Sequence, residues 1–534
     1  MSTTALRDRA TPLLHDYLSA SARRLGDKVA IVCDGQRATF AEIDRRADEM
    51  AAFFERQGVG RGDRILIFAD NTIHTVIAFW AVQRANAVVS VVSPLTKSHK
   101  LAYLLNDCRA VGLVTEAHLA RTFQRAAKVA PHLRLTVVDG EMDAAELLAL
   151  PQGTRFADAR IPGAPAPARR CIESDLCAII YTSGSTGDPK GVMHTQRSML
   201  TAATSVSTYL EMVEDDVVLC ALPLSFDYGL YQVIMSARVG ARVVLARSFA
   251  YPAQVLALMA QEQVTGFPGV PTIFAMLADM ESARSADWSH IRFVTNTAAA
   301  LHEKQIRAVQ RMFPGARIYS MYGLTECQRC TYLPPEDLDR KPTSVGVAIP
   351  NTELWIIDEA GQPLPPGQVG QLVIRGPTLM RGYWEKPEST AKRLQPGPWP
   401  GELVLHTGDL CRMDQDGYLY FVGRTDDIIK SRGEKVAPKE VEGALMSISG
   451  VREAAVIGVA DEVLGEAIHA FVVLEDGASL TPTQIQRECQ SRLESFKVPK
   501  TVILVGELPK TTSGKISKLE LRPPGPPAPR QEPL

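Results

Sequence analysis

One stretch of the sequence, YTSGSTGDPKGV at residues 181–192, combines glycines, hydroxyl side chains and a lysine. Glycines let main-chain N–H groups approach an anion closely, and hydroxyl and ammonium groups donate to phosphate oxygens. The spacing does not match the GxxxxGK[ST] pattern of a Walker loop. From these residues alone, a phosphate-binding loop and an ordinary solvated turn are both possible. The candidate phosphate-contacting residues are Thr182, Ser183, Gly184, Ser185, Thr186, Gly187 and Lys190.

The elements that position this loop are predicted from the spacing of apolar residues. Residues 176–180 form an apolar run, which predicts a buried strand directly before the loop. Elsewhere in the N-terminal part, β-branched runs alternate with stretches of helical spacing. This alternation predicts an α/β fold of layered, largely parallel sheets. The clearest strands are 64–68, 88–92, 135–139 and 241–245, and the clearest helices are 40–57 and 251–264.

The C-terminal part of the chain follows two other patterns. Closely spaced strands with Gly/Pro turns over residues 353–422 predict a β-rich subdomain. A compact unit of mixed strands and helices follows, which predicts a small α+β domain over residues 426–521 and an N-terminal domain over residues 1–425. Residues 522–534 are rich in proline and are predicted to form a disordered tail, because they cannot bury enough apolar surface to order themselves.

Composition limits the class of protein. A chain of 534 residues is too long for one core, and its formal net charge of −2 argues against binding nucleic acid through phosphate neutralisation. With no secretory signal and no apolar run long enough to span a bilayer, we expect a cytoplasmic protein. The nine cysteines are scattered, which favours reduced thiols. Cys327 and Cys330 form one C-x-x-C without a second ligand pair, so core packing is favoured over a metal site.

Further motifs follow the glycine-rich loop in a specific order. Together with that loop they resemble the motifs of the adenylate-forming superfamily, which includes acyl-CoA synthetases, nonribosomal peptide adenylation domains and luciferases. The resemblance covers about residues 12–520. It implies that the loop holds the β- and γ-phosphates of ATP. The further motifs are MYGLTE at 321–326, TGDL at 407–410, GRTDDIIK at 423–430 and PKTTSGKI at 509–516.

The resemblance also implies roles around the nucleotide. Tyr322 would stack on adenine, although a tyrosine in the core is the alternative. Thr325 would contact the α-phosphate, and Glu326 would hold Mg²⁺, which needs only one or two carboxylates beside phosphate oxygens. Asp409, with Arg424 beside it, would bind the ribose hydroxyls. By itself, Asp409 could instead form an Asx turn.

One segment departs from the family. Many relatives carry a Gly-Gly-Ala-Pro-like loop along the adenine, whereas this chain has NTAAAL at residues 296–301. The adenine contacts would fall on Thr297, Ala298 and Ala299, where methyl groups replace glycine hydrogens.

Two half-reactions are implied, and the small C-terminal domain would rotate between them. Lys515 would first touch the carboxylate and the α-phosphate, where it stabilises charge that develops as pyrophosphate leaves. The segment around Gly433 would then replace it and line a tunnel for the pantetheine thiol. Asp426 is the candidate hinge, and a plain linker aspartate is the alternative.

The residues Ser225-Phe226-Asp227 bear on the substrate. Phe226 stands where many acyl-CoA synthetases have histidine, and the order resembles the S-F-D of amino-acid adenylation domains, where the aspartate pairs with the substrate ammonium. A buried carboxylate needs such a partner. An aspartate that caps a local turn is the alternative. The residues narrowly favour an amino or imino acid over a neutral fatty or aryl acid.

The sequence therefore predicts a stand-alone, ATP-dependent acid–thiol ligase that uses Mg²⁺. Its acceptor would be the phosphopantetheine thiol of CoA or of a separate acyl or peptidyl carrier protein. A luciferase-type oxygenase shares these motifs, and product analysis with oxygen would separate it. A non-catalytic nucleotide sensor or a structural protein is disfavoured, because Glu326, Asp409 and Lys515 are all present.

Overall fold

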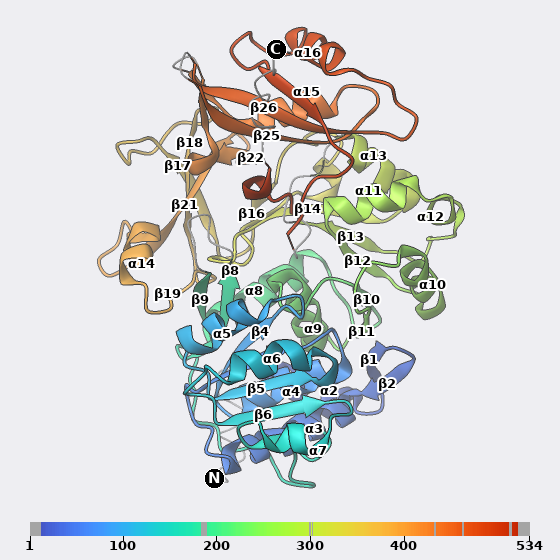
Figure 1. Ribbon diagram of the computed structural model, residues 1–534, viewed down its shortest axis with the longest axis vertical. Coiled ribbons are helices and arrows are strands. Elements are labelled where there is room, and N and C mark those ends of the chain that lie inside the picture. The colour runs from blue at the N-terminus through green and yellow to red at the C-terminus, as the bar shows by residue number, and fades with distance from the viewer. Residues whose placement is uncertain are drawn as a thin grey trace, which may run out of the picture.

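A computed structural model describes residues 12–182, 189–297, 301, 303–431, 434–461, 464–511 and 515–521. The chain runs from two α/β sheets through a β-rich subdomain to a small C-terminal unit, shown in orange and red in Figure 1. This arrangement confirms the predicted fold class. The predicted tail at 522–534 lies outside the described residues, and the domain boundary near residue 426 stays a prediction.

The first sheet has eight strands in the order β19-β9-β8-β4-β3-β5-β6-β7. Alternate residues of β3 point to opposite faces, as the two-residue period of a strand requires. Ile65 and Ile67 join one core cluster, and Leu66 and Phe68 join another. The strands are β3 (Arg64–Phe68), β4 (Val88–Val92), β5 (Gly112–Glu116), β6 (Leu135–Asp139), β7 (Gly153–Arg155), β8 (Leu176–Thr182), β9 (Lys190–Thr195) and β19 (Gly382–Tyr383).

The second sheet has nine strands in the order β16-β15-β14-β13-β12-β10-β11-β1-β2, and β14 through β1 are parallel. The strands are β1 (Val29–Cys33), β2 (Gln36–Thr39), β10 (Val217–Cys220), β11 (Arg242–Leu245), β12 (Gly266–Gly269), β13 (Phe293–Asn296), β14 (Arg317–Tyr322), β15 (Thr331–Tyr332) and β16 (Val347–Ala348).

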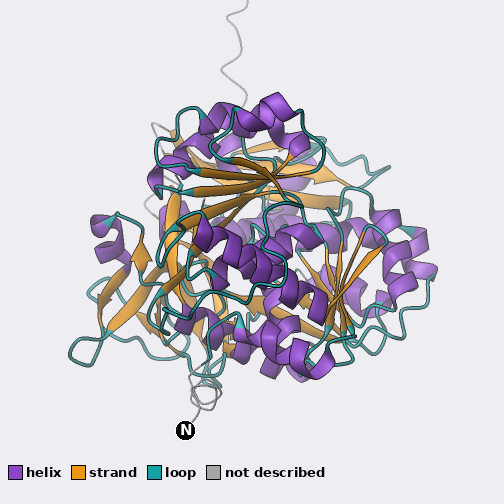
Figure 2. Cartoon of the chain, turned by 90° about the horizontal axis from the view of Figure 1, so that it is seen from below, coloured by secondary structure: helices purple, strands orange, loops and turns teal. Residues whose placement is uncertain are grey.

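Helices pack between the two sheets and outside them, as Figure 2 shows in purple. Helix α4 (Ile73–Arg84) is apolar around most of its circumference and contacts β3, β4 and β1, so it is buried between the sheets. The other helices of this part are α2 (Asp16–Leu25), α3 (Phe40–Arg56), α5 (Ser98–Asp107), α6 (Ala120–Ala127), α7 (Ala144–Leu148), α8 (Gln196–Tyr209), α9 (Asp227–Val239), α10 (Pro252–Glu262), α11 (Pro271–Asp279), α12 (Glu281–Ser285) and α13 (Glu303–Met312).

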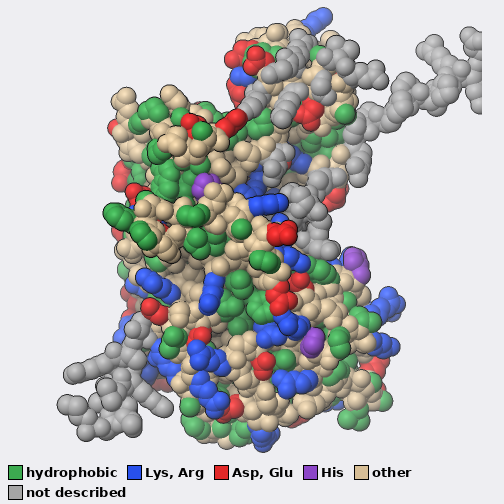
Figure 3. Space-filling model, turned by 90° about the vertical axis from the view of Figure 1, so that its left-hand side faces the viewer, with side chains coloured by type: hydrophobic (Ala, Val, Ile, Leu, Met, Phe, Trp, Pro, Cys, Tyr) green, Lys and Arg blue, Asp and Glu red, His purple; other side chains and the backbone are tan. Residues whose placement is uncertain are grey.

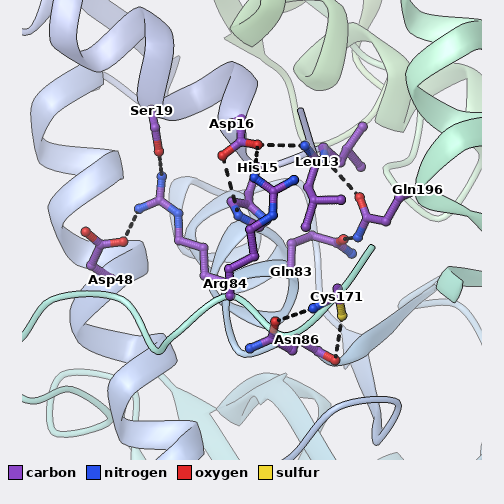
Figure 4. Close-up of polar contacts among 12 residues, drawn as sticks. Leu13, His15, Asp16, Ser19, Asp48, Gln83, Arg84, Asn86, Cys171 and Gln196 are labelled. Atoms are coloured by element: carbon purple, nitrogen blue, oxygen red, sulfur yellow. Dashed lines mark hydrogen bonds and ion pairs between the residues drawn. The ribbon is translucent and has the colours of Figure 1, made fainter. Parts of the chain in front are cut away.

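A polar network ties the start of the chain to this core (Figure 4). The Leu14 amide donates to Gln196 Oε1 at 2.9 Å, and Gln196 Nε2 donates to Gln83 Oε1 at 3.0 Å; Figure 4 labels Gln196 and Gln83. Gln83 Nε2 in turn donates to the Cys177 carbonyl at 2.8 Å. Nearby, Arg84 is buried and pairs with two aspartates, Asp44 and Asp48. The network therefore fixes β8, which directly precedes the glycine-rich loop, and the start of α8, which follows that loop and β9 in sequence.

The β-rich subdomain is an antiparallel sheet in the order β17-β18-β21-β20, with β22 on β21. Cys327 and Cys330 lie in its core cluster, and all nine cysteines are free and buried, in agreement with the packing interpretation. Its elements are β17 (Glu353–Ile357), β18 (Val369–Arg375), α14 (Pro387–Arg393), β20 (Leu394–Pro396), β21 (Leu403–Met413) and β22 (Leu419–Arg424).

The C-terminal unit packs two helices against a sheet in the order β24-β23-β26-β25, with β27 parallel to β26. Its elements are β23 (Ile429–Ser431), β24 (Glu434–Val436), α15 (Pro438–Met446), β25 (Val451–Asp461), β26 (Gly465–Leu474), α16 (Pro482–Gln490) and β27 (Thr501–Leu504). Across the part of the chain that the structure covers, no helix combines the length and apolarity that a bilayer crossing requires. On the face in Figure 3, side chains of both charge signs are interspersed.

Candidate active site

Several of the candidate site residues lie where strands of the second sheet end. Tyr322 is the last residue of β14, Thr297 follows the end of β13, and Phe226 and Asp227 follow β10 at the start of α9. Because β10, β13 and β14 belong to one parallel set, their carboxyl ends lie along one edge of the sheet. Ligands of open α/β sheets bind at such an edge.

Asp409 is the centre of a buried polar group in the β-rich subdomain. It is 1% exposed and pairs in register with Arg424 on the neighbouring strand. Asp409 Oδ2 accepts a hydrogen bond from the Tyr322 hydroxyl, and Arg424 Nη1 lies 3.6 Å from Oδ1. Burial raises the pKa of Asp409, although Arg424 and Tyr322 favour its charged form.

The other carboxylate oxygen of Asp409 can still accept a hydrogen bond. Its Oδ1 is buried and accepts no hydrogen bond from the described residues. No Asx-turn hydrogen bond from a described residue to this side chain is recorded, so the turn alternative has no support. A buried acceptor without a donor is costly, and a ligand hydroxyl would satisfy it. The group therefore suits the ribose role that the resemblance implies.

We expect Asp409→Asn to raise KM for ATP by about 10- to 100-fold, because a hydrogen bond to a charged group contributes about 1.5–3 kcal/mol. Wild type should also discriminate against 2′,3′-dideoxy-ATP, and the variant should discriminate much less. Steady-state pyrophosphate exchange measures both effects. Asp416→Asn, on an exposed turn beside the same strand, is the control. Equal discrimination by wild type and Asp409→Asn would contradict the ribose role.

A buried histidine that sequence reasoning did not single out supports the Thr325–Glu326 segment. His194 Nε2 lies 2.8 Å from the Thr325 carbonyl, and its Nδ1 lies 2.7 Å from Gln328 Nε2. Burial lowers the pKa of His194 to about 4, so the ring is neutral near pH 7. The Gln328 amide therefore donates to Nδ1, and Nε2–H donates to Thr325. This chain of hydrogen bonds fixes the main chain immediately before Glu326.

Glu326 has one occupied and one open oxygen. The Tyr383 hydroxyl donates to its Oε1 at 2.6 Å, and within the described residues no hydrogen bond to Oε2 is recorded. The Lys190 ammonium lies 5.4 Å from the centre of the Tyr383 ring, so the end of the glycine-rich loop approaches this carboxylate. One carboxylate beside phosphate oxygens is the donor set that Mg²⁺ prefers. The residues present fit that ion.

Asp227 already has partners within the chain, and its side chain is only 4% exposed. Its Oδ2 lies 3.2 Å from Arg329 Nη1, and its Oδ1 accepts from the Tyr228 amide at 2.8 Å. The Arg329 guanidinium lies over the Tyr228 ring at 4.9 Å. Burial by itself lowers the pKa of Arg329, but Asp227, Tyr209 and Tyr228 together raise it by more, so the pKa is raised. Sequence reasoning missed Arg329, which stands only three residues after Glu326.

Lys515 enters the same region from the C-terminal unit. In Figure 1 the red end of the chain lies below the C-terminal sheet, toward β14 and β16. Lys515 still touches solvent, yet desolvation by the surrounding atoms lowers its pKa. The carboxylates of Asp227 and Asp409 act in the opposite direction and raise it, so the Lys515 ammonium lies within electrostatic range of both buried acid–arginine pairs.

The structure describes some of the remaining candidate residues and leaves others outside the described ranges. Thr182 ends β8 and pairs in register with Lys190 on β9, and Thr297 is buried. The roles assigned to them stay predictions. Outside the described residues lie Ser183, Gly184, Ser185, Thr186, Gly187, Ala298, Ala299, Gly433 and the side chain of Asp426.

Two family models match the chain. The AMP-binding enzyme model covers residues 18–384, which is more than half of the chain, and the AMP-binding enzyme C-terminal domain covers residues 440–515. The chain belongs to the AMP-binding enzyme family. This confirms the predicted resemblance, and the motif segments at 181–192 and 321–326 fall inside the first match.

Individual relatives of this AMP-binding enzyme extend along nearly the whole chain. A long-chain-fatty-acid–CoA ligase of Escherichia coli O6:H1 is 30% identical over 95% of this chain and 94% of its own length. The anthranilate CoA ligase AuaEII, solved with anthranoyl-AMP, matches with a TM-score of 0.86 and 27% identity over 95% of both chains. ATP-bound MatB from Rhodopseudomonas palustris matches with a TM-score of 0.83 and 29% identity over 95% of this chain and 97% of its own.

Proposed function

We propose that this AMP-binding enzyme is an ATP-dependent ligase that activates a carboxylic acid as its acyl-adenylate and passes the acyl group to the thiol of CoA. The observation that carries the proposal is the buried Asp409, which contacts Tyr322 and Arg424 and whose Oδ1 accepts no hydrogen bond from the described residues. The Lys515 ammonium lies within electrostatic range of the same carboxylate. The similarity to ligases named for CoA, one of them solved with an acyl-adenylate, supports the same reaction. A separate carrier protein is the alternative acceptor.

In the first half-reaction, a carboxylate oxygen attacks the α-phosphorus of ATP. An O–P bond forms to the acid, and the bond between the α-phosphorus and the bridging oxygen breaks, so that pyrophosphate leaves with that electron pair. The role that the resemblance assigns to the Lys515 ammonium is to stabilise charge on the carboxylate and α-phosphate in that transition state. Tyr322 and Asp409 hold the nucleoside, and Thr325 meets the α-phosphate.

Glu326 is the proposed ligand for Mg²⁺, with Tyr383 orienting its carboxylate. When bound, this ion neutralises the charge of the phosphates. Lys190 and the hydroxyls of the glycine-rich loop are the proposed protein partners of the β- and γ-phosphates.

In the second half-reaction, the thiol sulfur attacks the acyl carbon, a C–S bond forms, the C–O bond to AMP breaks, and the thiol proton is lost. The resemblance assigns the thiol tunnel to the segment around Gly433 and the hinge to Asp426. Both assignments remain part of the proposal, since they require the C-terminal unit to turn.

We further propose that the tail of the acid is uncharged. Asp227 and Arg329 form a buried pair with no net charge, and both Asp227 oxygens are engaged within the chain. A substrate ammonium placed there would meet Arg329 and give the pocket a net positive charge, which is costly in a buried site. The sequence narrowly favoured an amino acid, but these contacts support the alternative of a neutral fatty or aryl acid.

The test is acid-dependent exchange of labelled pyrophosphate into ATP, with hexadecanoate, anthranilate and L-proline as probes and CoA thioester formation as the second readout. We expect exchange and thioester with at least one of the two acids whose tails are uncharged, and none with L-proline. Exchange with L-proline alone would overturn the tail assignment. A panel of acids without any exchange would overturn the ligase itself.

A further inference from the structure

Residues 509–511 and 515–517, here called the lysine hairpin, pair as two short antiparallel arms, and Lys515 begins the second arm. The Thr511 amide donates to the Lys515 carbonyl at 2.7 Å, and the Ser517 amide donates to the Pro509 carbonyl at 2.8 Å. The Lys515 amide also donates to Thr511 Oγ1 at 3.2 Å. These bonds shape the hairpin but do not attach it to the rest of the C-terminal unit.

Ile516 of the hairpin packs against a core cluster of the C-terminal unit that includes Ala455 and Phe471, and two ion pairs add to that attachment. Before the turn, Lys510 Nζ lies 2.9 Å from Glu453 Oε1 on β25. Just after the hairpin, Lys518 Nζ lies 2.7 Å from Glu442 Oε1 on α15. The two pairs differ in burial, because the Glu453 side chain is 20% exposed and the Glu442 side chain is 5% exposed. Ion pairs near solvent constrain a chain weakly, whereas a buried carboxylate depends on its partners.

Glu442 is fully engaged at its buried position. Besides Lys518, its Oε1 accepts from the Val456 amide at 3.0 Å, and its Oε2 lies 3.4 Å from Lys439 Nζ. Burial by itself raises the pKa of Glu442, but Lys439, Lys518 and the Val456 amide lower it further than burial raises it. The carboxylate is therefore charged near pH 7, and it joins α15, β25 and the segment that leaves the hairpin.

We propose that Glu442 is a positioning residue for Lys515: by holding Lys518, three residues farther along, it places the Lys515 ammonium toward Asp409 and Asp227. The inference rests on the proposed role of Lys515 in adenylation. Helix α15 begins directly after β24 and Ala437, so the helix that anchors the lysine hairpin also follows the segment proposed for the thiol tunnel. A small displacement of Lys515 would matter, since misplacing a reacting group by about 1 Å can cost on the order of 100-fold in rate.

The test measures where the Lys515 ammonium lies without any substrate. Competitive acetylation with acetic anhydride over a pH series, read by peptide mass spectrometry, gives the titration midpoint of Lys515. In wild type the midpoint should lie below about 10.4, the value of an unperturbed lysine. Glu442→Gln and Lys518→Met should move it toward that value, because the ammonium leaves its desolvated place in the site. Glu440→Gln, on the same helix but paired with Lys497 near solvent, should leave it unchanged.

Heat unfolding of the same proteins separates positioning from loss of fold. Lys518→Met removes the same ion pair but leaves Glu442 paired with Lys439. The position of Lys515 can therefore be measured in this variant if Glu442→Gln does not fold. A raised Lys515 midpoint in a folded variant supports the proposal. An unchanged midpoint in both variants overturns it, whatever acid the enzyme uses. The expected consequence in pyrophosphate exchange is a fall of about tenfold or more in kcat, with KM for ATP nearly unchanged.

Discussion

Replacing Lys515 with alanine should lower acid-dependent pyrophosphate exchange by about 100- to 1,000-fold, the range seen when one preorganised donor to a developing charge is removed. The loss should fall on kcat, since the lysine acts on the transition state and contributes little to holding ATP. Thioester formation from presynthesised acyl-adenylate should largely survive, because no α-phosphate charge develops in that step. Lys500→Ala, another surface lysine of the C-terminal unit, serves as the control.

The titration of Lys515 should also make pyrophosphate exchange depend on pH. The charged ammonium is the active form, so its contribution is present below its pKa and is lost as pH rises through that value. Because desolvation lowers the pKa of Lys515, exchange should decline at a lower pH than the titration of a free lysine would give. Equal loss of both half-reactions in Lys515→Ala, or an alkaline limb unchanged in the variant, would contradict the assigned role.

Breaking the Asp227–Arg329 pair from one side should destabilise the fold by about 3–5 kcal/mol, because the remaining charge stays buried without its partner. Both Asp227→Asn and Arg329→Met should show this in urea unfolding. The double variant should lie closer to wild type than the sum of the two single changes, because no unpaired charge remains. A coupling free energy near zero in this double-mutant cycle would mean that the pair is not formed.

The same double-mutant cycle also distinguishes an amino-acid substrate from an uncharged acid. Asp227→Asn by itself would reduce activity with either class of substrate. An amino acid would lose the carboxylate that balances its ammonium, and with a neutral acid Arg329 would be left unpaired in the site. The double variant separates the two cases. With an uncharged acid, exchange should recover in the double variant relative to either single change, and with an amino acid it should not. Glu211→Gln, which breaks the exposed pair with Arg317, is the control and should alter little.

The order of motifs was readable from the sequence because glycine, proline and charged residues mark local structure. Strands 64–68, 88–92 and 135–139 were predicted with the bounds they have, since β-branched runs between turns have few alternatives. The helix predicted over 251–264 instead begins at Pro252, because proline suits the first turn and lacks the N–H that a helix interior needs.

The site residues were predicted by type, and their partners were not. Lys515, Asp409 and Tyr322 follow from motifs, but a motif does not say that Tyr322 donates to Asp409 or that Asp409 Oδ1 is left without a donor. Those facts depend on the register of β21 against β22 and on the approach of β14, and such long-range pairing is set by packing of the whole sheet.

The sequence by itself determined the family, the α/β and β-rich organisation, and the residue types proposed to meet the nucleotide, because each is carried by motifs and patterns of local spacing. Only the tertiary structure decided which residues the buried charged side chains pair with. Asp227 was recognised as a buried acid in need of a cation, yet the cation is Arg329, 102 residues away. Glu442 and Lys518 are likewise far apart in sequence. A buried charge takes whichever partner folding brings within reach, and no local pattern records that choice.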